Sequence, residues 1–269
     1  MRRPSRGSEA EVEERRQAAL RHVAEEGEIR IADLAGRLGV SVMTMHRDLD
    51  NLHERQLLRK GRGVATAFPN LTMESALRFR EHVNMAAKEA IADALVEEVT
   101  PGSTVLIDCG STLFPLARRL AGIEGLRVIT NSLRVTYLLA GSPVEVTLLG
   151  DRFYEDFASC AGPQARRELK HLRAGVAFVT ATSVSDGRLY HPVREYADNK
   201  GAYVQAADRA VLAVDHSKFG RTATHSYGDV SGYDLLVTDA GAPESELRSV
   251  RDLGVAIRTG EAGVRTPRS

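Results

Sequence analysis

The strongest constraint on the fold lies in residues 84–260, where short apolar runs alternate with segments of helical periodicity. Thr104–Asp108 and Leu126–Thr130 are continuous apolar runs of strand length, and Leu113–Leu120 between them has the pattern of a helix. Strands that alternate with helices pair in parallel and are buried on both faces. The pattern therefore predicts an α/β domain with a mainly parallel sheet over residues 84–260.

The alternation extends in both directions from these first strands. A helix with apolar positions from Met85 to Val99 precedes them, and Pro101-Gly102 ends it. Further strands are expected at Val144–Leu149, Val176–Thr180, Ala210–Asp215, Leu235–Asp239 and Val255–Arg258. Further helices are expected at Leu133–Leu139, Pro163–Leu172, Arg194–Ala207 and Glu244–Leu253. At 269 residues the chain has room for a second, smaller domain before residue 84.

A helix-turn-helix is predicted in the first third of the chain. Its second helix covers Val40–His53: Ser41 is a good N-cap, and Met45, Leu49 and Leu52 at i, i+4 and i+7 form one buried stripe. The helix before it has a short apolar face made of Ile31, Leu34, Ala35 and Leu38, and Gly39 ends it. A first helix is expected at Glu11–Glu26, with Arg16, Leu20 and Val23 on its inner face.

The buried stripe turns Thr44, His46 and Arg47 outward, on the turns that such a helix offers to bases in a major groove. Two short amphipathic helices also occur in many domains that never touch nucleic acid. The segment that follows favours DNA binding, because Leu57–Ala67 has the pattern of two short strands around a Gly61-Arg62-Gly63 tip.

The tip and its strand place Arg59, Lys60 and Arg62 on a basic hairpin, or wing, that suits phosphate contact. Residues 11–68 are thus predicted to be a winged helix-turn-helix domain that binds double-stranded operator DNA, and residues 69–83 a linker. The predicted DNA-binding residues are Ser41, Thr44, His46, Arg47, Arg59, Lys60 and Arg62.

These residues resemble the DNA-binding domain of DeoR-type transcriptional regulators. The similarity lies in Ile31-Ala-Asp-Leu-Ala35, Leu38-Gly-Val-Ser41 and Thr44-Met-His-Arg-Asp-Leu49. The family usually has two arginines at His46-Arg47, so the resemblance carries over Arg47 as a DNA contact. It usually has a His-Gly-Gly-Ala wing where this chain has Lys60-Gly-Arg-Gly-Val64.

A ligand site is predicted at the carboxyl ends of the parallel strands, where ligands of open α/β sheets bind. Asp108-Cys-Gly-Ser-Thr112 follows one strand: Gly110 permits close backbone approach, and Ser111 and Thr112 offer hydroxyl and N–H groups at the start of a helix. Thr130-Asn-Ser132 repeats this arrangement after the next strand. Asp108 and Asp215 are suited to accept from sugar hydroxyls, and Lys218 to neutralise an anion.

The same region resembles the sensor domain of DeoR-type regulators in Lys88–Ala92, Asp108–Thr112, Val128–Leu133, Glu195 with Lys200, and Asp215–Phe219. The resemblance implies a fold like that of ribose-5-phosphate isomerase and an effector that is a phosphorylated sugar or a related metabolite. Gly150-Asp151 departs from the paired glycines usual there. The predicted effector-binding residues are Asp108, Gly110, Ser111, Thr112, Thr130, Asn131, Ser132, Glu195, Lys200, Asp215 and Lys218.

The chain carries little net positive charge with which to bind DNA. The chain has 36 Lys and Arg against 36 Asp and Glu, and residues 1–67 have 13 against 11. So mildly basic a domain is expected to bind DNA as part of a homo-oligomer, a dimer or a tetramer.

No cofactor or metal site is expected. Two cysteines, Cys109 and Cys160, make neither a disulfide framework nor a zinc site, and His191, His216 and His225 lack metal-ligand spacing. Cys109 at a helix start is a conceivable nucleophile, but a small apolar filler is the favoured interpretation. The absence of an 18-residue apolar run or a signal-peptide pattern predicts a cytoplasmic protein without membrane contact.

The sequence thus favours a DNA-binding transcriptional regulator, usually a repressor in this family, that controls a carbohydrate or related metabolic operon and is not an enzyme. Two alternatives remain open. One is a sugar-phosphate isomerase-like enzyme with an accessory DNA-binding domain, since Asp108, Asp215 and Lys218 are chemically capable of such a reaction. The other is a DNA-binding scaffold whose α/β domain only oligomerises.

Overall fold

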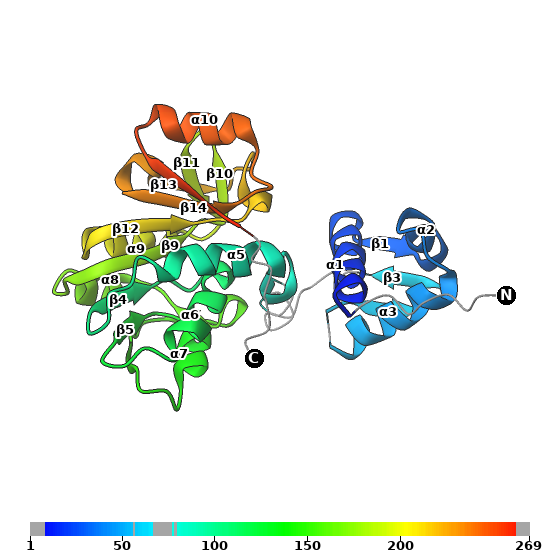
Figure 1. The fold of residues 1–269 in the computed structure, drawn as a ribbon, viewed down its shortest axis with the longest axis horizontal. Helices are drawn as coiled ribbons and strands as arrows, with labels where there is room; N and C mark the ends of the chain where they lie inside the picture. Colours follow the sequence, from blue (N-terminus) through cyan, green and yellow to red (C-terminus); the bar gives the residue numbers. More distant parts are fainter. Residues whose placement is uncertain (1–8, 56, 67–76, 78–79, 262–269) are drawn as a thin grey trace. The chain divides into compact units, whose positions relative to one another are not determined.

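The computed structural model of the chain describes residues 9–55, 57–66, 77 and 80–261. It contains two compact units, Met1–Val83 (the small unit) and Asn84–Ser269 (the large unit), each with its own apolar core (Figure 1). The predicted linker, residues 69–83, lies outside the described residues except for 77 and 80–83, as do residues 67 and 68 at the end of the predicted DNA-binding domain.

The small unit is a three-helix bundle with a three-stranded antiparallel sheet (Figure 1). Its elements are α1 (Glu9–Glu26), β1 (Glu28–Arg30), α2 (Ile31–Arg37), α3 (Val42–Glu54), β2 (Arg59–Gly61) and β3 (Val64–Thr66). Strand β3 lies between β1 and β2, so the hairpin that follows α3 is joined to the strand that precedes α2. The predicted winged helix-turn-helix architecture is present.

The start of α3 forms as its residues predict. Ser41 Oγ accepts a hydrogen bond from Thr44 N at 3.1 Å, and the Met45, Leu49, Leu52 stripe is fully buried. Arg16, predicted on the inner face of α1, has a side chain that is 24% exposed and pairs with Asp48 of α3. Its guanidinium thus keeps its charge at the rim of the apolar core.

The tip of the wing reverses differently from the predicted glycine turn. Gly61 pairs with Val64, which leaves Arg62 and Gly63 as a two-residue turn with φ of 47° and 81°. Such a turn needs positive φ at both central positions. Arg62 therefore occupies the left-handed position that the sequence pattern assigned to a glycine.

The large unit is built on seven parallel strands in the order β15-β14-β12-β9-β4-β5-β6, which confirms the predicted parallel sheet (Figure 1). The strands are β4 (Thr104–Ile107), β5 (Arg127–Thr130), β6 (Glu145–Leu148), β9 (Ala174–Thr180), β12 (Ala207–Ala213), β14 (Leu235–Asp239) and β15 (Ala256–Gly260). The helices are α5 (Met85–Val96), α6 (Phe114–Leu120), α7 (Leu133–Leu139), α8 (Pro163–Leu169), α9 (Arg194–Gln205) and α10 (Glu244–Asp252).

The strand order reverses between β4 and β9. From β4 the chain runs outward to β5 and β6, and from β9 it runs outward in the opposite direction to β12, β14 and β15. Helix α5 packs on β14 and β15 beside α6, and α9 packs on β9 and β12 beside α8. Loops diverge where a doubly wound sheet reverses its order, and that point at the carboxyl edge is where ligands bind in such sheets.

Several elements of the large unit were not predicted. Strands β10 (Ser183–Ser185), β11 (Arg188–His191) and β13 (His225–Asp229) form a small antiparallel sheet, and β7 (Phe153–Tyr154) pairs with β8 (Ser159–Cys160). Helices α5 and α8 also end earlier than predicted. Among the described residues, no helix combines the length and the apolar character needed to cross a bilayer.

Candidate functional site

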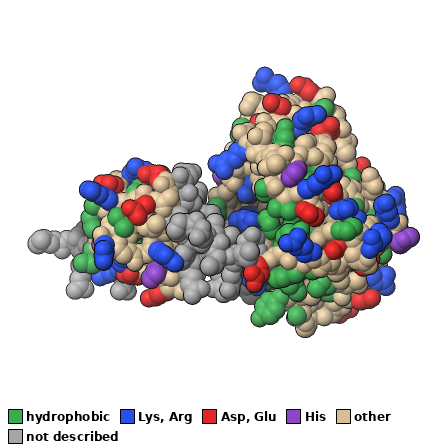
Figure 2. Space-filling view, turned by 180° about the vertical axis from the view of Figure 1, so that it is seen from behind, with side chains coloured by type: hydrophobic (Ala, Val, Ile, Leu, Met, Phe, Trp, Pro, Cys, Tyr) green, Lys and Arg blue, Asp and Glu red, His purple; other side chains and the backbone are tan. Residues whose placement is uncertain are grey.

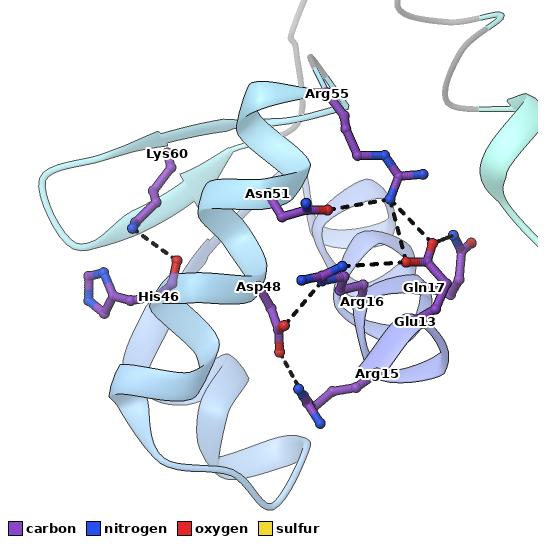
Figure 3. Close-up of polar contacts among 9 residues, drawn as sticks. All are labelled: Glu13, Arg15, Arg16, Gln17, His46, Asp48, Asn51, Arg55 and Lys60. Carbon is purple, nitrogen blue, oxygen red and sulfur yellow. Dashed lines mark hydrogen bonds and ion pairs between the residues drawn. The ribbon is translucent and has the colours of Figure 1, made fainter. Parts of the chain in front are cut away.

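The first turns of α3 carry the predicted base-reading residues. Arg47 is exposed, and Thr44 and His46 are half-buried. In Figure 3 the imidazole of His46 points away from the helices. Thr44 Oγ1 lies 2.9 Å from Ser41 Oγ, so both hydroxyls take part in the helix cap. Arg47 is therefore the predicted residue of this helix whose side chain is most available to a ligand.

Helix α3 is fixed to α1 by ion pairs. Asp48 is 3% exposed and accepts from Arg15 Nε at 2.6 Å and from Arg16 Nε at 3.2 Å (Figure 3). About two turns further along α3, at its C-terminal end, Arg55 pairs with Glu13 at 3.3 Å. Because Asp48 follows Arg47 directly, anchoring its carboxylate inward sets the rotation of α3 and holds the neighbouring arginine outward.

The wing is attached to α3 through Lys60. Its ammonium group donates to the carbonyl oxygen of His46 at 3.1 Å (Figure 3). It also donates to Asp50 Oδ1 at 2.5 Å. Arg59 and Arg62 are exposed. Lys60 thus positions the wing against the helix, whereas Arg59 and Arg62 offer the wing's positive charge to the outside. Figure 2 shows Lys and Arg side chains on the small unit interspersed with Asp and Glu, as its small charge surplus implies.

At the carboxyl edge of the large unit, the ends of β4 and β9 are joined at the reversal point. Asp108, which follows β4, accepts from Thr180 N at 3.1 Å and Thr180 Oγ1 at 2.8 Å. The ammonium group of Lys200 in α9 donates to the same carboxylate oxygen. Both residues are 2% exposed, so this is a buried ion pair. Two of the predicted effector residues therefore meet directly, and Thr180 contacts both of them.

Electrostatics keeps this aspartate ionised. Burial by itself raises the pKa of Asp108, but the charge and hydrogen bond of Lys200 and the two bonds from Thr180 outweigh it and hold the pKa below its ordinary value.

Gly110 leaves space for the same threonine. A Cβ at this position would lie 2.0 Å from Thr180 Oγ1. The close approach predicted at Gly110 is thus made by a side chain of the protein itself. Beyond it, Lys88 Nζ lies 3.3 Å from Ser111 Oγ, and Lys88 is 2% exposed. Thr112 is buried in the short helical turn Ser111–Leu113 that precedes α6.

A second carboxylate lies after β12. Asp215 Oδ1 accepts from Asn84 Nδ2 at 3.1 Å, from Ser217 N at 3.1 Å and from the Ser217 hydroxyl. Burial raises the pKa of Asp215, but Lys218, Ser217 and Lys88 outweigh it and lower the pKa. Asp215 Oδ2 is buried and accepts no hydrogen bond from the described residues.

The predicted residues after β5 are engaged in the fold. Asn131 donates from Nδ2 to the Cys160 carbonyl at 2.7 Å and accepts at Oδ1 from the Tyr203 hydroxyl at 3.0 Å. Ser132 caps α7, and Thr130 Oγ1 accepts from Ser132 N at 3.1 Å. These hydrogen bonds hold the loop after β5 in place at the carboxyl edge of the sheet, beside the strand that ends at the Asp108–Lys200 ion pair.

Two further predicted features lie apart from this arrangement. Glu195 is half-buried in the first turn of α9 and makes no hydrogen bond or ion pair with the other predicted effector residues among those described. Asp151 accepts from the backbone N–H groups of Gln164 at 2.6 Å and Ala165 at 3.1 Å, so it caps α8. Gly162 before that helix has no side chain to do so.

Comparison with protein families identifies the chain. A model of the DeoR C-terminal sensor domain matches residues 83–240, which is more than half of the chain, and a DeoR-like helix-turn-helix domain matches residues 15–69. The chain belongs to the DeoR family. It is accordingly a transcriptional regulator with a DNA-binding domain and a sensor domain.

Several DeoR-type relatives span nearly the whole chain. It is 32% identical over 251 residues to the uncharacterised HTH-type transcriptional regulator YgbI of Escherichia coli, covering 92% of this chain and 98% of that one. The glycerol-3-phosphate regulon repressor of Escherichia coli is 29% identical, covering 89% and 95%. Ribose 5 phosphate isomerase A from Neisseria gonorrhoeae overlaps 55% of this chain and 54% of its own, with a TM-score of 0.37 and 18% identity.

Four residues of the DeoR sensor domain reach the site although they were not in the predicted set. Thr180 had a signal in the sequence, because it ends a strand of the sheet and the other strand ends were considered. Lys88 also had a sequence signal, because it belongs to a segment that resembles the DeoR sensor domain. Asn84 and Tyr203 had none, since their contacts with Asp215 and Asn131 bridge distant segments.

The buried Cys109 of this DeoR-family chain packs with Ala161 and Tyr196, which confirms it as an apolar filler. Burial and the neighbouring Asp108 raise the pKa of Cys109 to about 12, so its thiol stays protonated at neutral pH. No group of three His, Cys, Asp or Glu side chains within the described part of the chain is arranged to hold a metal ion.

A shallow cavity of about 440 Å³ lies between α8 and α9 and contains none of the predicted effector residues. Its lining includes Arg166, Arg167, Lys170, Asp198 and Gln205.

Proposed function

We propose that this protein is a repressor that binds operator DNA as a homo-oligomer, a dimer or a tetramer, and releases it when an anionic, hydroxyl-bearing metabolite binds the large unit. One observation carries the choice of ligand: Asp215 Oδ2 is buried and has no hydrogen-bond donor among the described residues. Leaving a buried carboxylate oxygen unpaired is costly, and a sugar hydroxyl supplies the donor it lacks.

The charges around this oxygen favour an anion. Asp108 is matched by Lys200, whereas Asp215 is influenced by two cations, Lys218 and Lys88. Two ammonium groups thus act on the carboxylate whose Oδ2 has no donor. Lysine ammonium groups form charge-assisted hydrogen bonds with phosphate, so a phosphorylated sugar or polyol suits both the lysines and the unpaired carboxylate oxygen. The relative named as a glycerol-3-phosphate regulon repressor is named for such a compound.

Operator recognition is assigned to the N-terminal turns of α3 and to the wing. Arg47 is proposed to contact DNA in the major groove, and Arg59 and Arg62 to contact phosphates. One short helix reads few base pairs, so two copies on paired half-sites supply the specificity. The effector controls binding because its affinity differs between the conformations that do and do not fit the operator.

The direct test uses the purified full-length protein and DNA from upstream of its own gene. Affinity is measured over a range of salt concentrations, then with sugar phosphates and their unphosphorylated counterparts. We expect sequence-preferring binding with a steep salt dependence that one phosphorylated compound abolishes. Equal affinity for random DNA at every salt concentration would refute the proposal, and turnover of the sugar phosphate would favour the isomerase alternative.

The variant Arg47→Ala is expected to weaken operator binding by about 10- to 100-fold, because a specific contact to DNA contributes about 1–3 kcal/mol. Its salt dependence should also become shallower if the contact is to phosphate. The matched control is Arg127→Ala, which removes an exposed, ion-paired arginine from the large unit. Equal losses in the two variants would contradict the proposed role of Arg47.

The variant Asp215→Asn is expected to lose at least about 10-fold in effector affinity while keeping operator affinity, because its amide NH2 cannot accept from a hydroxyl. The control is Asp229→Asn. Asp229 caps a short helical turn through Ser231 with the same pattern of contacts, but it is half-exposed. Calorimetric titration with the active phosphate compound measures the effector affinity of both variants, and only Asp215→Asn should have lost affinity. An unchanged response of Asp215→Asn would remove this residue from the site.

A further inference from the structure

We propose that Val42 and Met43, the first two residues of α3, select operator half-sites by contacting the C5-methyl groups of thymines in the major groove. The inference rests on the DNA binding proposed above and adds residues outside the predicted set. Val42 is 46% exposed and Met43 is 66% exposed. Two adjacent large apolar residues thus lie on the surface at the end of the helix that such domains present to base edges.

The local structure does not require apolar residues at these two positions. The hydrophobic contact that normally fixes a helix start joins the residue before the N-cap to the fourth residue of the helix. Here those positions are Val40 and Met45, and both pack in the core of the small unit. Val42 and Met43 contribute nothing to that contact, so their apolar character calls for another explanation.

The electrostatics of the first turn also points to DNA. Acidic residues are favoured at helix N-termini because of the helix dipole, yet the first turn of α3 contains none. An acidic residue there would repel the phosphate backbone of a docked duplex. A first turn that is apolar rather than acidic suits a helix end that faces nucleic acid.

The neighbouring hydroxyls leave the apolar pair as the main contact surface of this turn. Ser41 Oγ and Thr44 Oγ1 lie 2.9 Å apart, and Ser41 Oγ also accepts from Thr44 N. Both hydroxyls are therefore engaged in capping. The thymine methyl is the apolar group that the base edges offer in the major groove, and apolar side chains recognise it there.

Helical spacing ties the two residues to the polar contacts. Met43 and Arg47 are at i and i+4, as are Val42 and His46, so each pair shares one face of α3. A thymine read by Met43 is therefore expected next to the nucleotide that Arg47 contacts. The long, unbranched thioether of methionine adapts to a methyl group in more than one position.

The experiment first selects preferred duplexes from a random library with the full-length protein. Each thymine of the half-site is then replaced by deoxyuridine, which removes only the methyl group. We expect a 3- to 10-fold loss of affinity at one or two thymines for the wild type. Met43→Gln, which preserves length and helix propensity, should lose most of this sensitivity and keep the salt dependence unchanged.

The control is Leu253→Gln, which changes an exposed apolar residue of the large unit and should retain the full deoxyuridine penalty. Specific binding by the wild type without any penalty would overturn the inference and leave the proposed function standing. A penalty that persists in both Met43→Gln and Val42→Ser, with an altered oligomeric state, would assign the pair to contact between copies instead. Absence of sequence-preferring binding would overturn both proposals.

Discussion

Replacing Lys200 with methionine is expected to destabilise the large unit by about 3–5 kcal/mol. Lys200 and Asp108 are each 2% exposed, and the ammonium group is the charge partner of that carboxylate. Methionine fills a similar volume, so the cost arises from a buried carboxylate that retains only the hydrogen bonds of Thr180. Urea-induced unfolding of the full chain, followed through the transition of the large unit, measures it.

The loss should depend on pH in a defined direction. In the wild type the pKa of Asp108 is lowered, so its contribution to stability is present above the ordinary aspartate pKa and is lost as pH falls through the lowered value. Without Lys200, burial dominates and raises the pKa. The variant's carboxyl then takes up a proton at a higher pH than the wild-type carboxyl does, so the difference in stability between the two proteins narrows as pH falls through the variant's raised pKa.

The double variant Asp108→Asn with Lys200→Met distinguishes the cost of an unpaired charge from the cost of altered packing. It removes both charges at nearly constant volume, so most of the stability lost in Lys200→Met should return. A double variant no more stable than Lys200→Met, or a loss independent of pH, would show that the cost is one of packing rather than of an unpaired charge.

The second large effect is expected for Gly110→Ala, at about 3–5 kcal/mol, because overpacking is combined with a lost hydrogen bond to a charged group. The new Cβ would lie 2.0 Å from Thr180 Oγ1 and 2.6 Å from its Cγ2. Gly110 has φ of −71°, so backbone strain plays no part. Thr180 must move, and its bond to Asp108 is then broken. The melting temperature and the affinity for the effector should both decrease.

The matched control is Gly201→Ala, in the interior of α9, where an added Cβ would meet no atom within 4 Å. Alanine has the higher helix propensity, so this variant should gain about 0.5–1 kcal/mol. If Gly110→Ala were as stable as the wild type, Thr180 would have an alternative position that leaves the Asp108 pair intact.

The small unit was largely predictable because its signals are local. The Ser41 cap, the Met45–Leu52 stripe and the Gly39 stop each depend on residues within two turns of one another. The roles of Lys60 and Asp48 were not predictable, since their partners lie 10 or more positions away in sequence. The sequence placed Lys60 among phosphate contacts because it is basic, and only the fold aims it at α3.

The parallel sheet was predictable because its strands are continuous apolar runs. The small sheet of β10, β11 and β13 was not. In β13, His225–Asp229, every residue is polar, Gly or Tyr, and the pairing with β11 crosses more than thirty residues. For the site, the predicted strand ends located the edge of the sheet. Thr180 also ends a strand and had that signal, whereas Asn84 became visible only through its contact with Asp215.

Asn84 sets a limit on exchanging parts between relatives. It is the first residue of the large unit, lies in a left-handed conformation with φ of 56°, and donates to Asp215 from a buried position. A chimera that grafts another DNA-binding domain onto this sensor must therefore join at or before Val83. A junction even one residue later would replace a side chain of the candidate ligand site, and the exchanged protein would inherit a new operator together with an altered response.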